Sequence, residues 1–438
     1  MNDSLAMEWE QATLGELSQM RRGITYDSAQ LVSEDSGIAY INMKSFLKGG
    51  GLNRDGTKTY SGTFSPSDLI ESNDVLLANT DVTAGDIVGV PALLPEIMCE
   101  QPTLFSHHVT RLRLIGEVQP KFLYYLLCIP EYRYQMLRIA RGTTVLMLDM
   151  KALKRIPIRF PKQHAFQNRI AEILTTIDEA IDQTEALIAK TQAIKAGLMN
   201  DLFTRGVTPD GKLRPSREEA PKLYKESPLG WIPKEWQTKR LDDIAQRGSG
   251  HTPNKNYPDY WNGGIKWVSL ADSWRLDRVY IAETDHEISK LGIDNSSAVM
   301  HPSGVVVLSR DAGVGKSAIT TCEMAVSQHF MCWRCSTSLD NHYLYYWLQY
   351  RKWEFENIAT GSTIPTIGLR YFKRYQINVP CEFDEQLKIS ITLLAADKKV
   401  FALEDDLRKL RHMKAGLMHD LLTGRVRVPV DELKKVMA

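Results

Sequence analysis

The feature that most constrains this chain is a block of sequence that it contains twice. Residues 195–207 read Lys-Ala-Gly-Leu-Met-Asn-Asp-Leu-Phe-Thr-Arg-Gly-Val, and residues 414–426 repeat 9 of these 13 positions without a gap, 219 residues later. Agreement of this length between two distant segments indicates an internal duplication rather than chance. The fold must therefore be built from two related halves.

Each copy of the block closes a longer run with the periodicity of a coiled coil. Apolar residues recur at alternating spacings of four and three, which is typical of the seam between supercoiled helices. The seam expected for the first run is Ile170, Leu174, Ile177, Ile181, Thr184, Ile188, Thr191, Ile194, Leu198 and Leu202. The seam expected for the second is Ile389, Leu393, Ala396, Val400, Leu403, Leu407, Leu410, Lys414, Leu417 and Leu421, with the lysine as its polar exception. At a rise of about 1.5 Å per residue, each helix should be about 50 Å long.

A single helix of this kind usually belongs to a bundle or a dimerisation coil. Two matched copies separated by large dissimilar segments favour instead a pairing of the two helices with each other, which would make them a spacer. The residues expected to hold the helices together or to dock a partner are Ile177, Ile181, Ile188, Leu198, Leu202, Leu403, Leu407, Leu410, Leu417 and Leu421.

The segments before the two helices also correspond, at low identity but in the same order. Residues 8–9 and 37–42 match residues 235–236 and 264–269 at a constant offset of 227, and the Leu-Tyr-Tyr run at 123 recurs at 344. Short strands mixed with a few helices predict an α+β fold for both. The expected division is into globular segments 1–161 and 236–380, long helices 162–206 and 381–425, a linker 207–235 rich in proline and glycine, and a tail 426–438.

Composition bounds the class of protein. The chain is 43% hydrophobic and 24% charged, with a formal net charge of +1, so it is an ordinary globular protein that can still gather basic groups on one face. We found no run of apolar residues long enough to span a membrane and no basic, apolar leader, and we therefore expect a cytoplasmic protein. The six scattered cysteines are expected to be reduced.

Motifs of catalysis are missing from the sequence. The segment 311–317 suggests a phosphate loop, but Arg310 stands where that motif needs glycine. Cys332 and Cys335 lie near His329, yet the sequence lacks the second pair of ligands that a zinc site needs. Nucleophile elbow, zinc-protease and dinucleotide signatures do not occur, nor does the Asn/Asp-Pro-Pro-Tyr/Phe motif of adenine methyltransferases. We expect neither a catalytic residue nor a metal site.

Basic and polar loop residues point to nucleic acid. Among the charged residues of 141–162, all but Asp149 are lysine or arginine. Arg370, Lys373 and Arg374 stand at the corresponding place of the second half. Such groups can neutralise phosphates, while arginine, asparagine, threonine and lysine on nearby loops can reach base edges. A merely solvated face remains the alternative for either cluster alone.

The candidates for DNA contact are chosen by loop position and side-chain chemistry. They are Arg22, Thr25, Tyr26, Asn42, Lys44, Asn79, Thr80, His107, Arg141, Thr143, Thr144, Lys154, His251, Thr252, Asn254, Lys255, Ser269, Asp272, Arg310, Lys316, His329, Ser362, Thr363 and Lys373.

Together these features identify a family resemblance. Two variable globular segments, each followed by a helix that ends in a Lys-Ala-Gly-Leu-Met block, resemble the DNA-specificity subunit of type I restriction-modification enzymes. The lead-in at 227–236, Ser-Pro-Leu-Gly-Trp-Ile-Pro-Lys-Glu-Trp, the turns at 142–144 and 361–363 and the turn at 310–315 are similar to that family too. The N-terminus departs from it, because residues 8–9 lack the Ser-Pro-Leu-Gly preamble.

The resemblance implies two target-recognition domains, each followed by a long helix, with the helices paired as an antiparallel coiled coil of pseudo-twofold symmetry. Each domain would read one half of a split, asymmetric DNA sequence, and the helices would set the spacing and dock two modification subunits. Those partners would bind S-adenosylmethionine and methylate adenine, and motor-nuclease subunits would add ATP, Mg²⁺ and cleavage. This chain would itself bind no cofactor.

Two other classes of function stay open at this point. The chain could be a coiled-coil scaffold whose globular domains bind proteins, in which case its complexes would lack nucleic-acid affinity. An autonomous nuclease or methyltransferase is disfavoured by the missing motifs.

Overall fold

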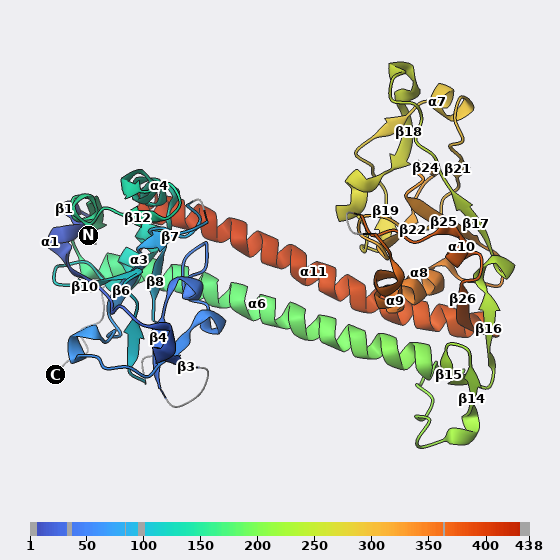
Figure 1. Ribbon diagram of the computed structural model, residues 1–438, viewed down its shortest axis with the longest axis horizontal. Coiled ribbons are helices and arrows are strands. Elements are labelled where there is room, and N and C mark those ends of the chain that lie inside the picture. Colours follow the sequence, from blue (N-terminus) through green and yellow to red (C-terminus); the bar gives the residue numbers. More distant parts are fainter. Residues whose placement is uncertain (1–6, 33–36, 84, 95–100, 362–363, 430–438) are drawn as a thin grey trace, which may run out of the picture. The chain divides into compact units, whose positions relative to one another are not determined.

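The computed structural model describes residues 7–32, 37–83, 85–94, 101–361 and 364–429. The chain forms two compact units, of which unit 1 comprises 1–185 and 405–438 and unit 2 comprises 186–404. Figure 1 shows that two long helices, α6 (His164–Thr204) and α11 (Phe383–Leu422), dominate the fold. Unit 1 therefore contains the start of α6 and the end of α11, and unit 2 contains the end of α6 and the start of α11.

The two long helices run antiparallel in each unit. In unit 1, Ile170 and Leu174 of α6 share a core with Leu421 of α11. In unit 2, Leu202 near the end of α6 shares a core with Ile389 near the start of α11. This confirms the predicted pairing. Within the described part of the chain, neither long helix nor any shorter one is long and apolar enough to cross a membrane.

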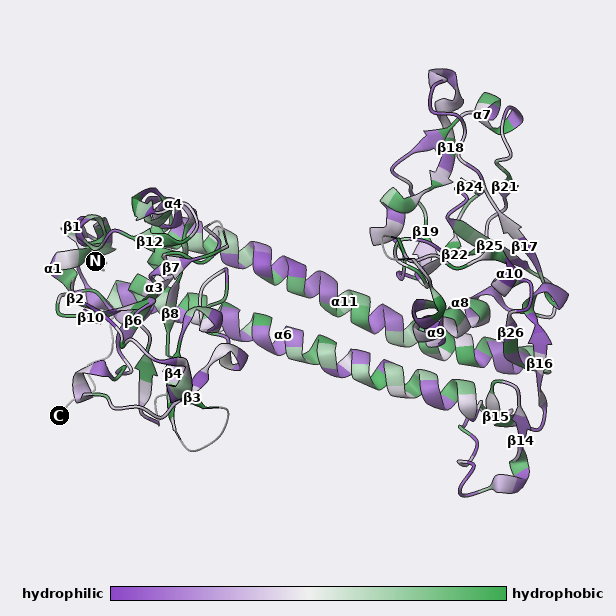
Figure 2. Ribbon diagram, viewed as in Figure 1, coloured by the Kyte–Doolittle hydropathy of each residue, from purple (hydrophilic) through white to green (hydrophobic). Residues whose placement is uncertain are grey.

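The predicted seam is correct except at one position. All ten residues expected to hold the helices together are buried or half-buried, and Figure 2 shows apolar and polar residues alternating along both helices. Ile194, however, is 60% exposed, and the neighbouring Lys195 faces α11 instead. An ion pair between Lys195 and Asp397 replaces the expected aliphatic contact at this level.

The globular part of unit 1 is an assembly of small sheets covered by short helices. Its sheets have the strand orders β2-β10-β6-β8, β3-β5-β4-β9 and β11-β12-β7, with a separate β1-β13 pair. The bounds are β1 Trp9–Thr13, α1 Leu14–Leu17, β2 Ser18–Arg22, β3 Leu31–Val32, β4 Ile38–Ile41, β5 Lys58–Tyr60, β6 Asp74–Ala78, β7 Thr80–Asp81, β8 Pro91–Leu93, β9 Thr103–Phe105, β10 Val109–Leu114, α3 Pro120–Cys128, α4 Pro130–Ile139, β11 Ala140–Arg141, β12 Leu146–Leu148, α5 Met150–Lys154 and β13 Pro157–Pro161.

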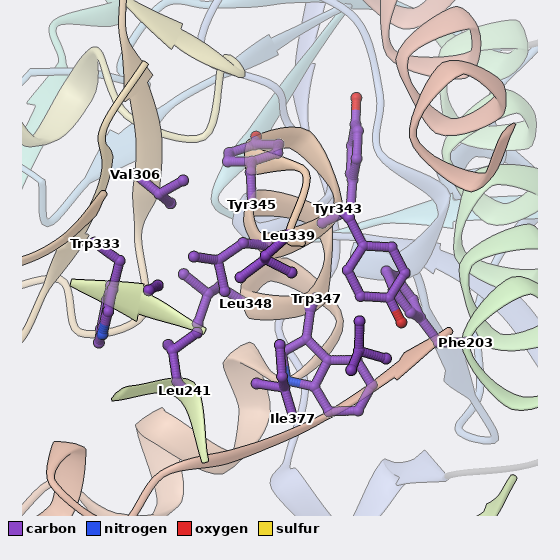
Figure 3. Packing of buried hydrophobic residues seen from close by; sticks show 14 of the residues in the cluster. Phe203, Leu241, Val306, Trp333, Leu339, Tyr343, Tyr345, Trp347, Leu348 and Ile377 are labelled. Carbon is purple, nitrogen blue, oxygen red and sulfur yellow. The ribbon is translucent and has the colours of Figure 1, made fainter. Parts of the chain in front are cut away.

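The globular part of unit 2 repeats this plan with a five-stranded sheet, β17-β25-β22-β23-β19, and a four-stranded sheet, β20-β18-β24-β21. Figure 3 shows its aromatic core, in which Phe203 of α6 lies against Trp347 and Tyr343. The bounds are β16 Trp236–Arg240, β17 Ala245–Ser249, β18 Trp261–Val268, β19 Tyr280–Ile281, β20 Glu287–Ile288, α7 Lys290–Asp294, β21 Met300–His301, β22 Val306–Ser309, β23 Ser317–Thr320, β24 Met324–Val326, β25 Phe330–Cys335, α8 Asn341–Tyr350, α9 Lys352–Ile358, α10 Leu369–Phe372 and β26 Gln376–Pro380.

In each globular part, an equivalent pair of antiparallel strands joins the beginning of the domain to its end. The first strand, β1 or β16, lies antiparallel to the strand before the long helix, β13 or β26, so that Trp9 pairs with Pro161 and Trp236 with Pro380. Each domain thus begins and ends at one place. This confirms the correspondence that the sequence indicated between the two halves.

The segment 207–235 is not the structureless linker that its proline and glycine content predicted. It contains a hairpin of β14 (Tyr224–Ser227) and β15 (Gly230–Pro233), whose Tyr224 and Ile232 are buried. Its Arg214 forms a buried ion pair with Glu385 of α11. Long-range packing in unit 2, which local composition does not reveal, orders this segment.

Candidate nucleic-acid interface

In each unit the candidate interface begins at a glycine where two chain segments cross closely. A Cβ atom added to Gly23 would lie 1.9 Å from the carbonyl oxygen of Phe105, and one added to Gly250 would lie 1.6 Å from that of Val326. A larger side chain at either place would force the backbone apart. The glycines therefore fix the position of the candidate threonines, which follow two residues later.

The crossed strand leads into a short turn that we call the histidine turn, residues 106–108 in unit 1 and 327–329 in unit 2. In unit 1 the rings of His107 and His108 lie 3.8 Å apart between centroids, and Nδ1 of His108 is 2.9 Å from Oγ1 of Thr80. The turn thus joins the end of β9 to the residues that follow β6.

The histidine turn of unit 2 has the same geometry with different side chains. Nδ1 of His329 lies 2.6 Å from a carboxylate oxygen of Asp311, which stands where unit 1 has Thr80. Thr252 donates a hydrogen bond of 2.6 Å to the side-chain oxygen of Gln328, which stands where unit 1 has His107.

The backbone around the two turns is also matched. The amide of Asn79 donates to the carbonyl of His108 at 2.7 Å, and the amide of Arg310 donates to that of His329 at 2.9 Å. The two halves therefore share the backbone hydrogen bonds of the turn, whereas the side chains that the turn carries differ.

The pKa values of His108 and of the nearby Asp81 are both lowered, but for different reasons. Burial lowers the pKa of His108, and the neighbouring His107 lowers it further. Burial alone would raise the pKa of Asp81, but hydrogen bonds from Thr83 and from the amides of 87–88 hold it below its ordinary value. The turn thus offers a neutral imidazole, which can donate or accept a hydrogen bond.

A glycine turn at residues 142–144 lies beside the histidine turn of unit 1. The sheet β11-β12-β7 joins them, since Thr80 pairs with Met147 across this sheet. The side chain of Arg141 is 81% exposed and its guanidinium lies 3.1 Å from Asp149. Both threonines of the turn are exposed as well. These groups can approach a ligand on the surface.

Each unit also carries three exposed basic residues at matching places, which we call its basic triplet. Those of unit 1 lie on or just after α5, and those of unit 2 lie on or just after α10. The triplets are Lys151, Lys154 and Arg155, and Arg370, Lys373 and Arg374. In unit 2 they line a hollow of about 680 Å³ together with Glu354.

A second hollow in unit 2 gathers several of the predicted residues. It has a volume of about 340 Å³, and Thr252, Lys255 and His329 line it together with Trp267 and His286. A hollow with hydroxyl, ammonium, imidazole and aromatic groups can take up a polar, planar ligand edge.

Five predicted residues lie in the interior of their unit, and we remove them from the candidate interface. Asn42 and Ser269 cap short helices by accepting hydrogen bonds from the backbone two residues on. Asp272 accepts hydrogen bonds from the amides of Ser269 and Asp285. Local folding explains these three polar residues. The five are Asn42, Asn79, Thr80, Ser269 and Asp272.

The remaining candidates fall into three groups. Those near the two histidine turns are Arg22, Thr25, Tyr26, His107, Arg141, Thr143, Thr144, His251, Thr252, Lys255, Arg310 and His329, whereas Lys44 and Asn254 are exposed elsewhere on the same units. Lys154 and Lys373 belong to the basic triplets, and the Lys316 ammonium donates to the carbonyl of Ser273. Ser362 and Thr363 lie outside the described residues.

Sequence reasoning missed His108 and Gln328 of the histidine turns, and Asp311, whose carboxylate lies beside His329. A usable signal existed: the Leu-Tyr-Tyr runs match at an offset of 221, and the same offset aligns residues 107–108 with 328–329.

Comparison with known proteins gives a consistent result. The family model described as type I restriction modification DNA specificity domain matches residues 7–193 and 233–410. The chain is 23% identical over 371 residues to the type I restriction enzyme MjaVIII specificity subunit of Methanocaldococcus jannaschii, covering 82% of this chain and 80% of that protein. It is 28% identical over 172 residues to the MjaIX specificity subunit of the same organism, covering 39% of this chain and 40% of that protein.

A solved structure has the same fold. The crystal structure of the type I restriction-modification system S subunit from M. genitalium matches with a TM-score of 0.60 at 15% sequence identity, covering 96% of this chain and 98% of that one. At this level of identity the likeness concerns the fold alone.

Proposed function

Because one model of the type I restriction-modification DNA specificity domain matches both halves, the chain belongs to that family, and we propose that its two globular domains each read one half of a split, asymmetric DNA target. The single observation that carries the proposal is the pair of histidine turns, which share one backbone frame and differ in their side chains.

The basic triplets support a common mode of positioning on DNA. Phosphate contacts carry no sequence information, so two readers of different sequences can keep the same phosphate contacts. Lys151, Lys154 and Arg155 correspond to Arg370, Lys373 and Arg374 without loss of a positive charge. The triplets are therefore the proposed phosphate contacts.

The histidine turns support different base contacts in the two units. His107 and Thr25 of unit 1 correspond to Gln328 and Thr252 of unit 2. Imidazole and amide groups have different hydrogen-bonding patterns, and base edges in the major groove are distinguished by such patterns. Two unlike turns on one scaffold would give a target with two unlike halves.

Catalysis would lie in the partners. We propose that two modification subunits bind the chain and supply S-adenosylmethionine and adenine methylation, and that restriction subunits supply ATP, Mg²⁺ and DNA cleavage. The absence of catalytic motifs from the sequence supports a non-catalytic role for this chain.

The first test is a map of methylated adenines. The chain would be co-expressed with a modification subunit of a type I system from the same genome, in a host that lacks other adenine modification. We expect one split motif with a methylated adenine in each half. A stable complex that methylates no motif would contradict the proposal and favour the scaffold function.

Four substitutions test the assignment of residues, measured as DNA affinity of that complex. Arg141→Ala and Lys154→Ala should weaken binding to all sequences and reduce the salt dependence by about one counterion each. Thr252→Ala and Arg310→Ala should relax recognition of one half-site only. Lys212→Ala, an exposed lysine of the linker, serves as the control. Unchanged affinity and selectivity in all four would refute the assignment.

A further inference from the structure

Each unit contains a cluster of lysine, aspartate and tyrosine that joins three helices. In unit 1, Asp178 of α6 accepts a hydrogen bond of 2.9 Å from the hydroxyl of Tyr125 in α3 and forms an ion pair of 2.6 Å with Lys414 of α11. The domain helix and both long helices thus meet at one carboxylate. We call this cluster the unit 1 lock.

The unit 2 lock has the same three residue types on the equivalent helices. Asp397 of α11 accepts a hydrogen bond of 2.9 Å from the hydroxyl of Tyr346 in α8 and forms an ion pair with Lys195 of α6. The Lys195 ammonium also lies 5.8 Å from the centroid of the Tyr346 ring. The side chain of Asp397 is only 4% exposed.

The duplication relates the two locks residue by residue. Asp178 and Lys195 recur as Asp397 and Lys414 at an offset of 219, so each long helix carries an aspartate and, 17 residues later, a lysine. An antiparallel pair can satisfy both aspartates at once. A parallel pair in register would instead set aspartate against aspartate and lysine against lysine, which is unfavourable.

The locks also distinguish the observed register from its neighbours. A slip of the helices by one heptad in one direction would place Asp397 opposite Leu202, and a slip in the other would place it opposite Ile188. The same slips would place Asp178 opposite Leu421 or Leu407. A carboxylate facing a leucine or isoleucine at a half-buried level loses its partners, which carries a high free-energy cost.

A gain in stability does not by itself explain why lysine and aspartate lie between the long helices. A buried ion pair is often no more stabilising than apolar residues of similar volume, and the best-attested role of polar groups in a coiled coil is to fix orientation and register. The tyrosines have a further role. Their hydroxyl groups donate to the aspartates of the ion pairs, and they thereby bind the helix of each globular domain to the long helices at that position.

We propose that the two locks are specificity-determining sites that fix how many base pairs separate the half-sites. By holding the helix register and the domain helix together, they would hold each reading surface at one place along the DNA. This inference rests on the proposed function. A displacement of about 3.4 Å corresponds to one base pair, so small shifts at the locks would change the spacing that is accepted.

The test compares the spacer length of methylated sites. The complex of the full chain with its methyltransferase would carry Lys195→Met or Asp397→Leu, or their equivalents Lys414→Met and Asp178→Leu. We expect each variant to methylate additional sites whose spacer differs by up to about three base pairs, because a slip of one heptad moves the helices by about 10.5 Å, with both half-sites unchanged. A role confined to stability would lower the amount of folded complex without altering the spacer.

Three further variants make the result decisive. The exchange Lys195→Asp with Asp397→Lys should restore the single spacer, because it restores the opposite charges. Tyr346→Phe removes only the hydroxyl and keeps the ring, so it tests the lock even if the charge variants fail to fold. Lys409→Met removes an exposed ion pair within α11 and should leave the spacer unchanged.

The outcomes separate this inference from the proposed function. If the unaltered chain gives no split motif, the proposed function fails. If it gives one, and folded lock variants, Tyr346→Phe included, keep its spacer, only the inference on the locks is overturned.

Discussion

At the scale of single residues, one buried glutamine fastens each long helix to its globular domain. Gln167 accepts a hydrogen bond from the amide of Gln119 at 2.7 Å and donates to the carbonyls of Glu117 and Pro161. Gln386 makes the same three hydrogen bonds in unit 2, to Asp340, Ser338 and Pro380. Both glutamines are buried.

We therefore expect Gln167→Leu and Gln386→Leu each to lower the free energy of unfolding by about 1–3 kcal/mol or more, because buried backbone groups would lose their partners. Thermal and denaturant unfolding of the purified chain would measure this. Gln183→Leu, at an exposed site on α6, should change stability by less than about 0.5 kcal/mol. Equal losses at all three sites would contradict the role assigned to the glutamines.

The glutamines show what sequence reasoning can and cannot find at this scale. The duplication predicts that Gln167 and Gln386 have one role, because they match at the offset of 219. It does not predict the role, since the hydrogen-bond partners are backbone groups that carry no residue signal. For the same reason Asn42 and Ser269 were expected at the interface, whereas their side chains cap short helices.

At the scale of elements, the periodic helices were predictable and the order of the linker was not. Heptad spacing predicted α6 and α11 within two or three residues at either end, because a long apolar seam determines a helix by itself. The order of residues 207–235 depends on a contact far along the chain. Glu385 accepts hydrogen bonds from Arg214, the amide of Val207 and the indole of Trp236.

Removal of Glu385 should therefore release the linker. We expect Glu385→Ala to lower the free energy of unfolding by about 3–5 kcal/mol, because it leaves the buried Arg214 without its partner. The double variant Arg214→Met with Glu385→Leu should lose much less, since no charge stays buried. Unfolding curves and limited proteolysis of residues 207–235 would compare them. A double variant as unstable as Glu385→Ala would show that the ion pair is not the cause.

At the scale of the whole molecule, the closing strands bring the two ends of each globular domain together, and we therefore expect each domain to be exchangeable. Trp9 pairs with Pro161 and Trp236 pairs with Pro380, so each domain enters and leaves its helix at one place. The sequence indicated this division through its matched borders. Residue chemistry applied to each half did not single out the surface that we propose to read DNA, although the offset of 221 aligns the two histidine turns.

Exchange of residues 236–380 for the matching segment of another family member should therefore change one half of the methylated motif and leave the other half and the spacer unchanged. Exchange of residues 9–161 should change the opposite half. The donor segment must begin with tryptophan, because the indole of Trp236 donates to Glu385, and its last residue must keep the backbone carbonyl that accepts from Gln386 in place. Mapping of methylated adenines would read both outcomes. A change in both halves after a single exchange would mean that the two domains do not read DNA independently, and the division into two readers would have to be abandoned.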